Sequence, residues 1–399
     1  MLAKHRVIFS LIVGVSIFLL AVVAIFWARG FKPDFKKGQI ERTGIIVATS
    51  IPTGAQVYLD GRLTSATNTN IAFLEPKTYQ VKIGKDGYSN WQKDVEVKAD
   101  LATEIKALLF PVAPQIKPLT STGAVNPSLS PDSTKIVYGV SGDRGGLYLL
   151  SMNQTPLPFR QDTRLLAKNQ GSFDFTKSTF IWSPDSRQAV AQFKDEGGKV
   201  NANLLIEADK TDQDLRDISG SLNATLASWQ EQLDNRAQTL ALSVPESVKS
   251  ATAEAEINEK PETRDQKLET TQLPNYPTTQ LNYFPTGLIF SPSEEKILFK
   301  NKEGKYKIYD TKANKELTLP DFEGLINISW YPDSNHLVVA QKELIAIIEV
   351  DGTNKMTVYS GKFENGFVFA HPTGDSLVIL TTLTQPEGTP ANLYGVNLR

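Results

Sequence analysis

The stretch Leu129-Ser130-Pro131-Asp132-Ser133-Thr134-Lys135-Ile136 places a proline turn between two apolar strand positions. The proline presets φ for the turn, and the Asp and Ser side chains accept backbone N–H bonds within it. The same turn recurs in four more places: Ser183-Pro184-Asp185-Ser186, Ser291-Pro292-Ser293-Glu294, Tyr331-Pro332-Asp333-Ser334 and His371-Pro372-Thr373-Gly374. Five copies of one strand–turn–strand unit predict a repeat fold.

The spacing of these turns predicts the blades of a β-propeller. Successive prolines lie 53, 108, 40 and 40 residues apart, and a repeat of about 40 residues with three or four strands is typical of propeller blades. Five residues after each proline comes an apolar strand position: Ile136, Ala189, Ile297, Leu337 and Leu377. We expect an irregular propeller of five blades, or six with a degenerate one. Residues 115–119 are a candidate strand for the last blade, and ring closure is left open.

These repeats resemble the WD40-like repeats of TolB-type propellers, and the resemblance covers residues 113–399. It implies the fold and leaves the function open, because propellers support binding and catalysis alike. Two interpretations of the turn carboxylates Asp132, Asp185 and Asp333 follow. They are either ligands or acids of a site, or caps of equivalent turns, and their recurrence favours capping.

An insertion at residues 211–283 interrupts the strand pattern. Its apolar residues recur at helical spacing, at Leu222, Leu226, Trp229 and Leu233. A second helix is predicted for Pro245–Ala255, and the charged, apolar-poor Asn258–Pro277 predicts a flexible linker. The apolar face is either a partner-binding surface or packed on the chain's own propeller, which is the usual fate of a single stripe.

Short alternating strands and tight turns predict a small β-sandwich at residues 44–112. Two motifs stand out: the turn Pro52-Thr53-Gly54-Ala55 followed by Val57-Tyr58-Leu59-Asp60-Gly61, and the set Tyr79, Val81, Ile83, Gly87 and Tyr88. This region resembles the PEGA domain, with Thr53 in place of the family's Glu. The resemblance implies a surface-exposed bacterial or archaeal protein and an accessory or binding role without catalytic residues. The same glycines and tyrosines also serve ordinary turns and a small core.

Val7–Trp27 is a run of 21 residues in which Ser10, Gly14 and Ser16 are the exceptions to an apolar set. As a helix it spans roughly 31 Å, the thickness of a bilayer core. The run exceeds the about 7–15 apolar residues of a cleaved signal peptide. We therefore expect a transmembrane helix at residues 7–28, after a short cytoplasmic tail at residues 1–6 and before a linker at residues 29–43. Basic residues flank both ends, so charge does not decide the orientation.

Charge and residue usage exclude several classes of function. The chain has 42 Lys/Arg and 44 Asp/Glu, with a net +5 in residues 1–43 and a net −7 in residues 207–269. This distribution does not match a nucleic-acid binder. Without cysteine, thiolate catalysis and Cys-ligated metals are excluded. The three histidines, His5, His336 and His371, lie in unlike contexts, and we expect no metal, cofactor or catalytic residue.

Together these patterns predict a mainly β, single-pass plasma-membrane protein of the cell envelope. The orientation is N-terminus inside, with the C-terminal domains extracytoplasmic. Its expected role is non-catalytic binding or scaffolding, with the lipid bilayer contacted through the helix and an envelope protein or cell-wall glycan as partner. The alternative is an anchored propeller enzyme acting on envelope glycans or peptides, which requires convergent carboxylates, Arg or a metal at the propeller's central opening.

Overall fold

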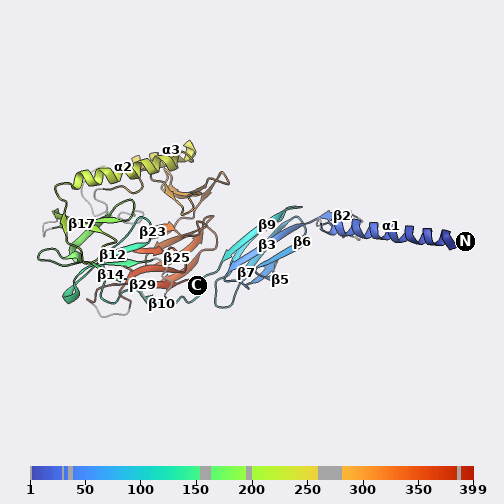
Figure 1. Ribbon diagram of the computed structural model, residues 1–399, viewed down its shortest axis with the longest axis horizontal. Coiled ribbons are helices and arrows are strands. Elements are labelled where there is room, and N and C mark those ends of the chain that lie inside the picture. The colour runs from blue at the N-terminus through green and yellow to red at the C-terminus, as the bar shows by residue number, and fades with distance from the viewer. Residues whose placement is uncertain are drawn as a thin grey trace. The chain divides into compact units, whose positions relative to one another are not determined.

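The computed structural model describes residues 2–28, 31–34, 39–152, 163–194, 200–258, 281–383 and 388–399. The chain divides into two compact units, residues 1–112 and residues 113–399 (Figure 1). Over the described residues, both units are built mainly from β-strands, apart from three α-helices and two short 3₁₀ turns.

The N-terminal unit starts with helix α1, Leu2–Ala28. Many of its apolar side chains are exposed, among them Phe9 and Leu20 at 70% and 68%. Counting only the residues that are fully described, no helix reaches the length and hydropathy of a membrane span. A two-stranded hairpin of β1, Phe31–Asp34, and β2, Gln39–Arg42, follows the helix in sequence.

Seven further strands form a β-sandwich of two sheets, in the orders β6-β3-β9 and β5-β4-β7-β8. Their bounds are Gly44–Ile51 (β3), Gln56–Leu59 (β4), Arg62–Ala66 (β5), Thr69–Leu74 (β6), Thr78–Gly84 (β7), Trp91–Glu96 (β8) and Ala102–Leu108 (β9). Strands β3 and β9 run parallel, and every other pairing is antiparallel. The alternating residues Ile46, Val57, Val81 and Ile83 are fully buried between the sheets. This is the period-2 pattern of a strand with one face in a core.

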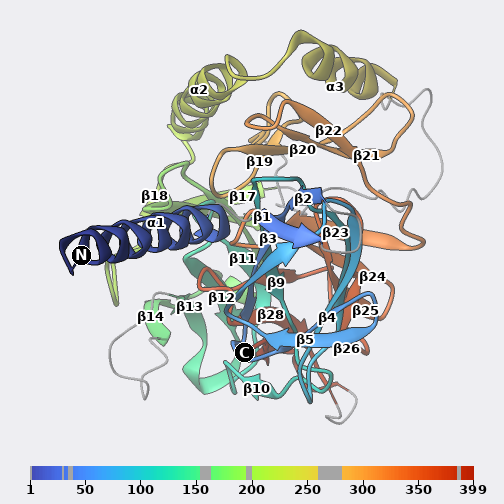
Figure 2. The ribbon, with the colours of Figure 1, turned by 90° about the vertical axis from the view of Figure 1, so that its right-hand side faces the viewer.

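The second unit contains five four-stranded antiparallel sheets, which are the five blades of a propeller (Figure 2). Blade 1 is β11 (Val125–Leu129), β12 (Lys135–Val140), β13 (Gly146–Ser151) and β14 (Thr163–Lys168). Blade 2 is β15 (Ser178–Trp182), β16 (Gln188–Lys194), β17 (Val200–Glu207) and β18 (Arg216–Asp217). Blade 3 is β19 (Ile289–Phe290), β20 (Lys296–Lys300), β21 (Tyr306–Asp310) and β22 (Lys315–Thr318). Blade 4 is β23 (Leu325–Trp330), β24 (His336–Gln341), β25 (Leu344–Glu349) and β26 (Met356–Ser360).

Blade 5 joins the two ends of the propeller sequence. Its strands are β27 (Val368–Ala370), β28 (Ser376–Thr381), β29 (Asn392–Asn397) and β10 (Ile116–Pro118), which comes from the start of the unit. Strand β10 pairs antiparallel with β29, and Ile116 lies opposite Val396. The segment at residues 115–119 therefore supplies this blade's outer strand. The described residues form no sixth blade.

The proline turns join the first and second strands of each blade, and in all five the N–H of the fourth turn residue donates to the carbonyl of the first. The turns of blades 1 and 2 add matching side-chain bonds. In blade 1, Ser130 Oγ donates to Asp132 Oδ1 at 2.6 Å and accepts from the Lys135 N–H at 3.0 Å. In blade 2, Ser183 and Asp185 repeat the first of these bonds at 2.6 Å. The fourth turn residue has a left-handed φ of 57–68° in all five copies: Ser133, Ser186, Glu294, Ser334 and Gly374. The five core positions that follow are at most 2% exposed: Ile136, Ala189, Ile297, Leu337 and Leu377.

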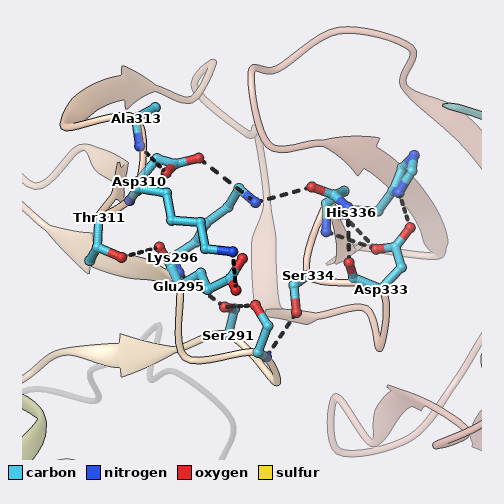
Figure 3. A network of polar contacts seen from close by, with 12 residues as sticks. Ser291, Glu295, Lys296, Asp310, Thr311, Ala313, Asp333, Ser334 and His336 are labelled. Carbon is cyan, nitrogen blue, oxygen red and sulfur yellow. Dashed lines mark hydrogen bonds and ion pairs between the residues drawn. The ribbon is translucent and has the colours of Figure 1, made fainter. Parts of the chain in front are cut away.

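Some of these turns also connect neighbouring blades. The Asp132 N–H of blade 1 donates to Ser186 Oγ of blade 2 at 3.0 Å, and the Ser293 N–H of blade 3 donates to Ser334 Oγ of blade 4 at 3.0 Å. Figure 3 shows the second contact within a network in which Lys296 Nζ also donates to Asn335 Oδ1 at 3.1 Å. Because Ser186 and Ser334 are buried, these hydrogen bonds hold adjacent blades in register.

The insertion contains helices α2, Leu222–Ala241, and α3, Glu246–Asn258, which lie along one side of the propeller (Figures 1 and 2). The predicted apolar face is packed inward. Leu222, Leu226 and Trp229 are 6–7% exposed and contact the Ile181 region of blade 2, with Leu233 half-buried beside them. Of the two alternatives for this face, the structure shows the favoured one, packing on the chain's own propeller, so these side chains are covered and do not form the alternative partner surface. The predicted linker at residues 258–277 lies, beyond Asn258, outside the described residues.

Candidate functional site

The sequence-predicted motif residues of the sandwich have structural roles. Ala55 is fully buried, and Gly54 and Gly61 have positive φ values of 72° and 78° that glycine adopts without strain. Asp60 accepts hydrogen bonds from Lys77 Nζ at 2.8 Å and from the Gln80 N–H at 3.0 Å. These bonds, that from Lys77 first, lower the pKa of the Asp60 carboxyl. Pro52 completes the turn that precedes Gly54.

The proline-turn carboxylates are likewise engaged in their own turns. Burial raises the pKa of Asp132, but hydrogen bonds from Ser130 and Thr134 outweigh it and lower the pKa overall. Asp333 behaves similarly: burial is opposed by hydrogen bonds from His336 and the backbone, and the pKa is lowered. His336 Nδ1 lies 2.6 Å from Asp333 Oδ2. Asp132 and Asp333 thus bond to residues of their own turns, as expected for side chains that cap a turn.

A pocket of about 670 Å³ lies beside the first strands of the blades and the proline turns that follow them. Strands β11, β19, β23 and β27, the first strands of blades 1, 3, 4 and 5, contribute to its lining. The turn prolines of all five blades also line it: Pro131, Pro184, Pro292, Pro332 and Pro372. Six aromatic residues also line it: Tyr283, Phe284, Phe290, Trp330, Phe367 and Phe369. The second half of helix α2 forms part of its lining through residues such as Leu233 and Leu240. A volume of this size is typical of small-molecule sites.

Two polar atoms in the wall of this pocket are buried and have no hydrogen-bond partner among the described residues. They are Asn327 Oδ1 and Ser329 Oγ on β23. Two residues apart on one strand, they lie on the same side of it. Asn327 is 8% exposed, and its Nδ2 donates to Val368 O at 3.3 Å and to Gly366 O at 3.5 Å in blade 5. An unsatisfied buried polar atom costs about 1–3 kcal/mol, so this pair calls for an explanation.

The amide group of Asn327 has a counterpart in blade 1. Asn126 and Asn327 both stand five residues before the turn proline, with Ser128 and Ser329 three residues before it. Asn126 Nδ2 donates to Thr176 O at 2.9 Å and to Ser178 O at 3.1 Å in the next blade. In both blades the amide nitrogen therefore donates hydrogen bonds to backbone carbonyls of the neighbouring blade. The unpartnered oxygens are peculiar to blade 4, within the part of the chain that is described.

The charged side chains that line the pocket are Asp132, Arg236 and Glu294. Arg236 on α2 pairs with Glu294 in the turn of blade 3 at 3.3 Å, and their side chains are 70% and 51% exposed. Asp132 is occupied by its own turn. No group of three or more His, Asp or Glu side chains suited to a metal ion occurs among the described residues.

The sequence predicted the proline turns but not the pocket. The five turn prolines line this pocket, where their rings provide an apolar surface. A usable signal was present, because the Asn-x-Ser spacing before the proline occurs in blades 1 and 4 alone among the five copies. Nothing in that spacing distinguishes the blade-1 pair from the blade-4 pair, whose side-chain oxygens are buried without partners, since the difference depends on tertiary packing.

A comparison with known protein families identifies the sandwich of the first unit. The family description "PEGA domain" matches residues 43–112, which confirms the predicted resemblance. A search of curated proteins found no significant match. The propeller assignment itself rests on the five-sheet topology.

Solved structures similar to this chain include TolB proteins. A protein assigned as TolB from Agrobacterium tumefaciens is 16% identical over 67% of this chain and 70% of its own, with a TM-score of 0.22. TolB from Acinetobacter baumannii is 11% identical over 86% of this chain and 63% of its own, with a TM-score of 0.23. A luciferin-regenerating enzyme is 11% identical over 71% of this chain and 95% of its own, with a TM-score of 0.30.

Proposed function

We propose that this chain is a membrane-anchored cell-envelope protein with a non-catalytic binding role, in which the propeller pocket receives the ligand. The observation that carries the proposal is the pocket of about 670 Å³ in the propeller, which is lined by the turn prolines of all five blades and by six aromatic side chains. A volume and a largely apolar lining of this kind are typical of small-molecule sites.

The anchor in this proposal is helix α1. Its support is the apolar run of 21 residues at Val7–Trp27 and the high exposure of apolar side chains such as Phe9 and Leu20, which lipid would cover. The PEGA domain favours placing both β units outside the membrane, with the short tail inside. Protease treatment of intact cells tests this topology. We expect digestion of the propeller, and full protection of it would reverse the orientation.

The non-catalytic part of the proposal is supported by how the pocket's charges are engaged. Asp132 is bound within its turn, and Glu294 pairs with Arg236. Neither arrangement resembles a pair of facing carboxylates that work as acid and base. An envelope protein or cell-wall glycan is the proposed partner. Co-purification from detergent-solubilised membranes tests it, comparing the wild type with a variant that lacks residues 44–112; an unchanged set of partners would exclude the PEGA domain as the contact.

Access to the pocket can be tested with a single introduced thiol, because the chain has no cysteine. We expect Thr286→Cys in the full chain, at a half-buried position of the pocket lining, to react with a small neutral methanethiosulfonate reagent. Leu242→Cys is the matched control, because Leu242 is 83% exposed and lies outside the pocket lining. Reaction of Leu242→Cys without reaction of Thr286→Cys would show that small molecules do not enter, and would overturn the proposed site.

A further inference from the structure

The exposed apolar side chains of the sandwich gather mainly at one end of it. Outside helix α1, ten large apolar side chains are exposed among the described residues, and six of these belong to residues 44–112. Four of the six lie at the end where strand β3 begins: Ile45, Leu63, Phe73 and Leu101. Their side chains are 38–60% exposed. Apolar side chains that gather in one place, unlike singly scattered ones, indicate an interaction surface.

Hydrogen bonds and an ion pair join the four chain segments at this end. Lys77 pairs with Asp60 at 2.8 Å, and the Val97 N–H donates to Lys77 O at 2.9 Å. The Asp100 N–H donates to Thr43 O at 3.0 Å. We call the joined segments the proximal rim, which consists of residues 42–45, 60–63, 73–77 and 97–101.

Within the proximal rim, Ile45 lies between Leu101 and Phe73 in the sheet. The Ile45 N–H donates to Leu101 O at 3.0 Å. On the other side of Ile45, the register of β3 and β6 shifts between Gly44 and Ile46, as at a β-bulge. Phe73 lies at this shift and has a φ of 60°, which bulky residues rarely adopt. Strained backbone of this kind is common at functional sites, which favours a role for the exposed ring.

The path of the chain keeps the proximal rim close to the end of helix α1. Phe31 follows the last helical residue, Ala28, by three positions, and it lies opposite Arg42 in the β1–β2 hairpin. Three residues span at most about 11 Å, and paired strands lie about 5 Å apart. Arg42 therefore lies within roughly 16 Å of Ala28, measured between Cα atoms. If α1 spans the bilayer, the rim is within reach of the headgroup layer, which is about 5–8 Å thick on each side.

Charge at the proximal rim is nearly balanced, with four Lys/Arg and three Asp/Glu. Three ion pairs lie at this end of the sandwich: Lys77–Asp60, Arg42–Asp100 and Lys98–Glu96. A surface that combines apolar side chains with paired ions suits zwitterionic headgroups, because it can approach them without leaving a charge uncompensated.

We infer that the proximal rim lies on the headgroup layer of the membrane, with Ile45, Phe73 and Leu101 inserted among the lipids. This inference rests on the proposed function, because it needs helix α1 as the anchor. The lipid removes the apolar area of these three side chains from water, and the paired ions remain at the surface.

Single introduced cysteines test the inference, because the chain has none. Leu101→Cys in the full chain carries a nitrobenzoxadiazole label, in phosphatidylcholine nanodiscs with and without a lipid that bears a nitroxide on its headgroup. We expect the nitroxide lipid to quench this label. The matched control is Ile51→Cys at the opposite end of β3, about 20 Å from Ile45, where the side chain is 49% exposed. Its label should keep its fluorescence.

Two further substitutions test whether the apolar side chain makes the contact. With the label placed on Ile45→Cys, Leu101→Glu should reduce the quenching, because a carboxylate at that position would have to leave water. Val112→Glu, at an exposed apolar position at the end of the sandwich opposite the proximal rim, should leave the quenching unchanged. Both positions are exposed, so the fold should be retained.

A label in helix α1 separates this inference from the proposed function. Phe18→Cys should be quenched by a lipid with a nitroxide deep in its acyl chain. Quenching at Phe18→Cys, with no more headgroup quenching at Leu101→Cys than at Ile51→Cys, would overturn the rim contact and leave the anchor. An unquenched Phe18→Cys would overturn both. A Leu101→Cys label that is shielded from water but not quenched would assign the rim to another protein surface, such as a second copy, and would overturn the lipid contact.

Discussion

The sandwich and the propeller differ in how completely their buried polar side chains are hydrogen-bonded. In the sandwich, Thr67 Oγ1 accepts the Ala55 N–H at 2.9 Å and shares a hydrogen bond with Ser50 Oγ at 2.5 Å, so the interior is satisfied. The three buried side-chain atoms without partners in the described part of the chain are Trp182 Nε1, Asn327 Oδ1 and Ser329 Oγ, and all lie in the propeller. Among the described residues, the sandwich therefore pairs its buried side-chain polar atoms, whereas the propeller leaves three of them without a partner.

The largest expected effects test whether the two units are separate. Ile83 and Leu337 are fully buried in the sandwich and in blade 4, and each alanine substitution should lower its own unit's free energy of unfolding by about 2–5 kcal/mol. Hydrogen exchange with mass spectrometry reports each unit separately. Ile83→Ala should speed exchange in residues 44–112, and Leu337→Ala in residues 113–399. Acceleration in both units by either variant would contradict their independence.

A sharper comparison removes one buried hydroxyl from each unit. Thr67→Val leaves the Ala55 N–H without its acceptor and should lower the sandwich's free energy of unfolding by about 1–3 kcal/mol. Ser329→Ala removes an atom that has no partner, so the propeller should stay unchanged or gain up to about 1 kcal/mol. Denaturant midpoints measure both. A destabilised Ser329→Ala would mean that its hydroxyl is satisfied in solution.

The sequence predicted the two β units and their turns, but it did not predict which buried polar side chains lack a hydrogen-bond partner. The proline turns located the blades because Pro131 and its four equivalents act locally, through φ and short-range hydrogen bonds. The helical stripe Leu222–Leu233 also identified a helix, although its covering face became evident only in the fold. The pocket was not predictable, because its lining comes from helix α2 and from blades 1, 3, 4 and 5, which are distant in sequence.

Acid sensitivity should also distinguish the units. Burial raises the pKa of Asp333, whose side chain is 32% exposed, but hydrogen bonds from His336 and the backbone lower this pKa overall. The contribution of Asp333 to stability is therefore present above its unfolded pKa, near 3.8, and is lost as the pH falls through the lower folded pKa. Asp333→Asn should flatten the acid side of the propeller's stability profile below about pH 5. Asp60→Asn is the matched sandwich variant. Because the Asp60 side chain is more exposed, at 44%, and its ion pair with Lys77 lies at the surface, this variant should change the profile less. Equal flattening by both variants would contradict this assignment.

The smallest expected effect concerns the ion pair between helix α2 and blade 3. Arg236 and Glu294 are mostly exposed, so Arg236→Gln should change the propeller's free energy of unfolding by less than about 1 kcal/mol. Thermal unfolding of the full chain at low and high salt measures this. A loss of several kcal/mol would show that the pair, rather than the packing of Leu226 and Trp229, fixes the helix.

The most direct test of the account is protection of a thiol inside the pocket. Thr286→Cys in the full chain is treated with the neutral methanethiosulfonate reagent, with and without saturating para-fluorobenzyl alcohol, a small neutral probe. The account predicts modification slowed about fivefold or more by the alcohol, because the two compete for the pocket that Thr286 lines. Leu242→Cys, outside the pocket, should react at one rate throughout. A Thr286→Cys thiol that reacts as fast with the alcohol as without it would contradict a ligand site in the propeller.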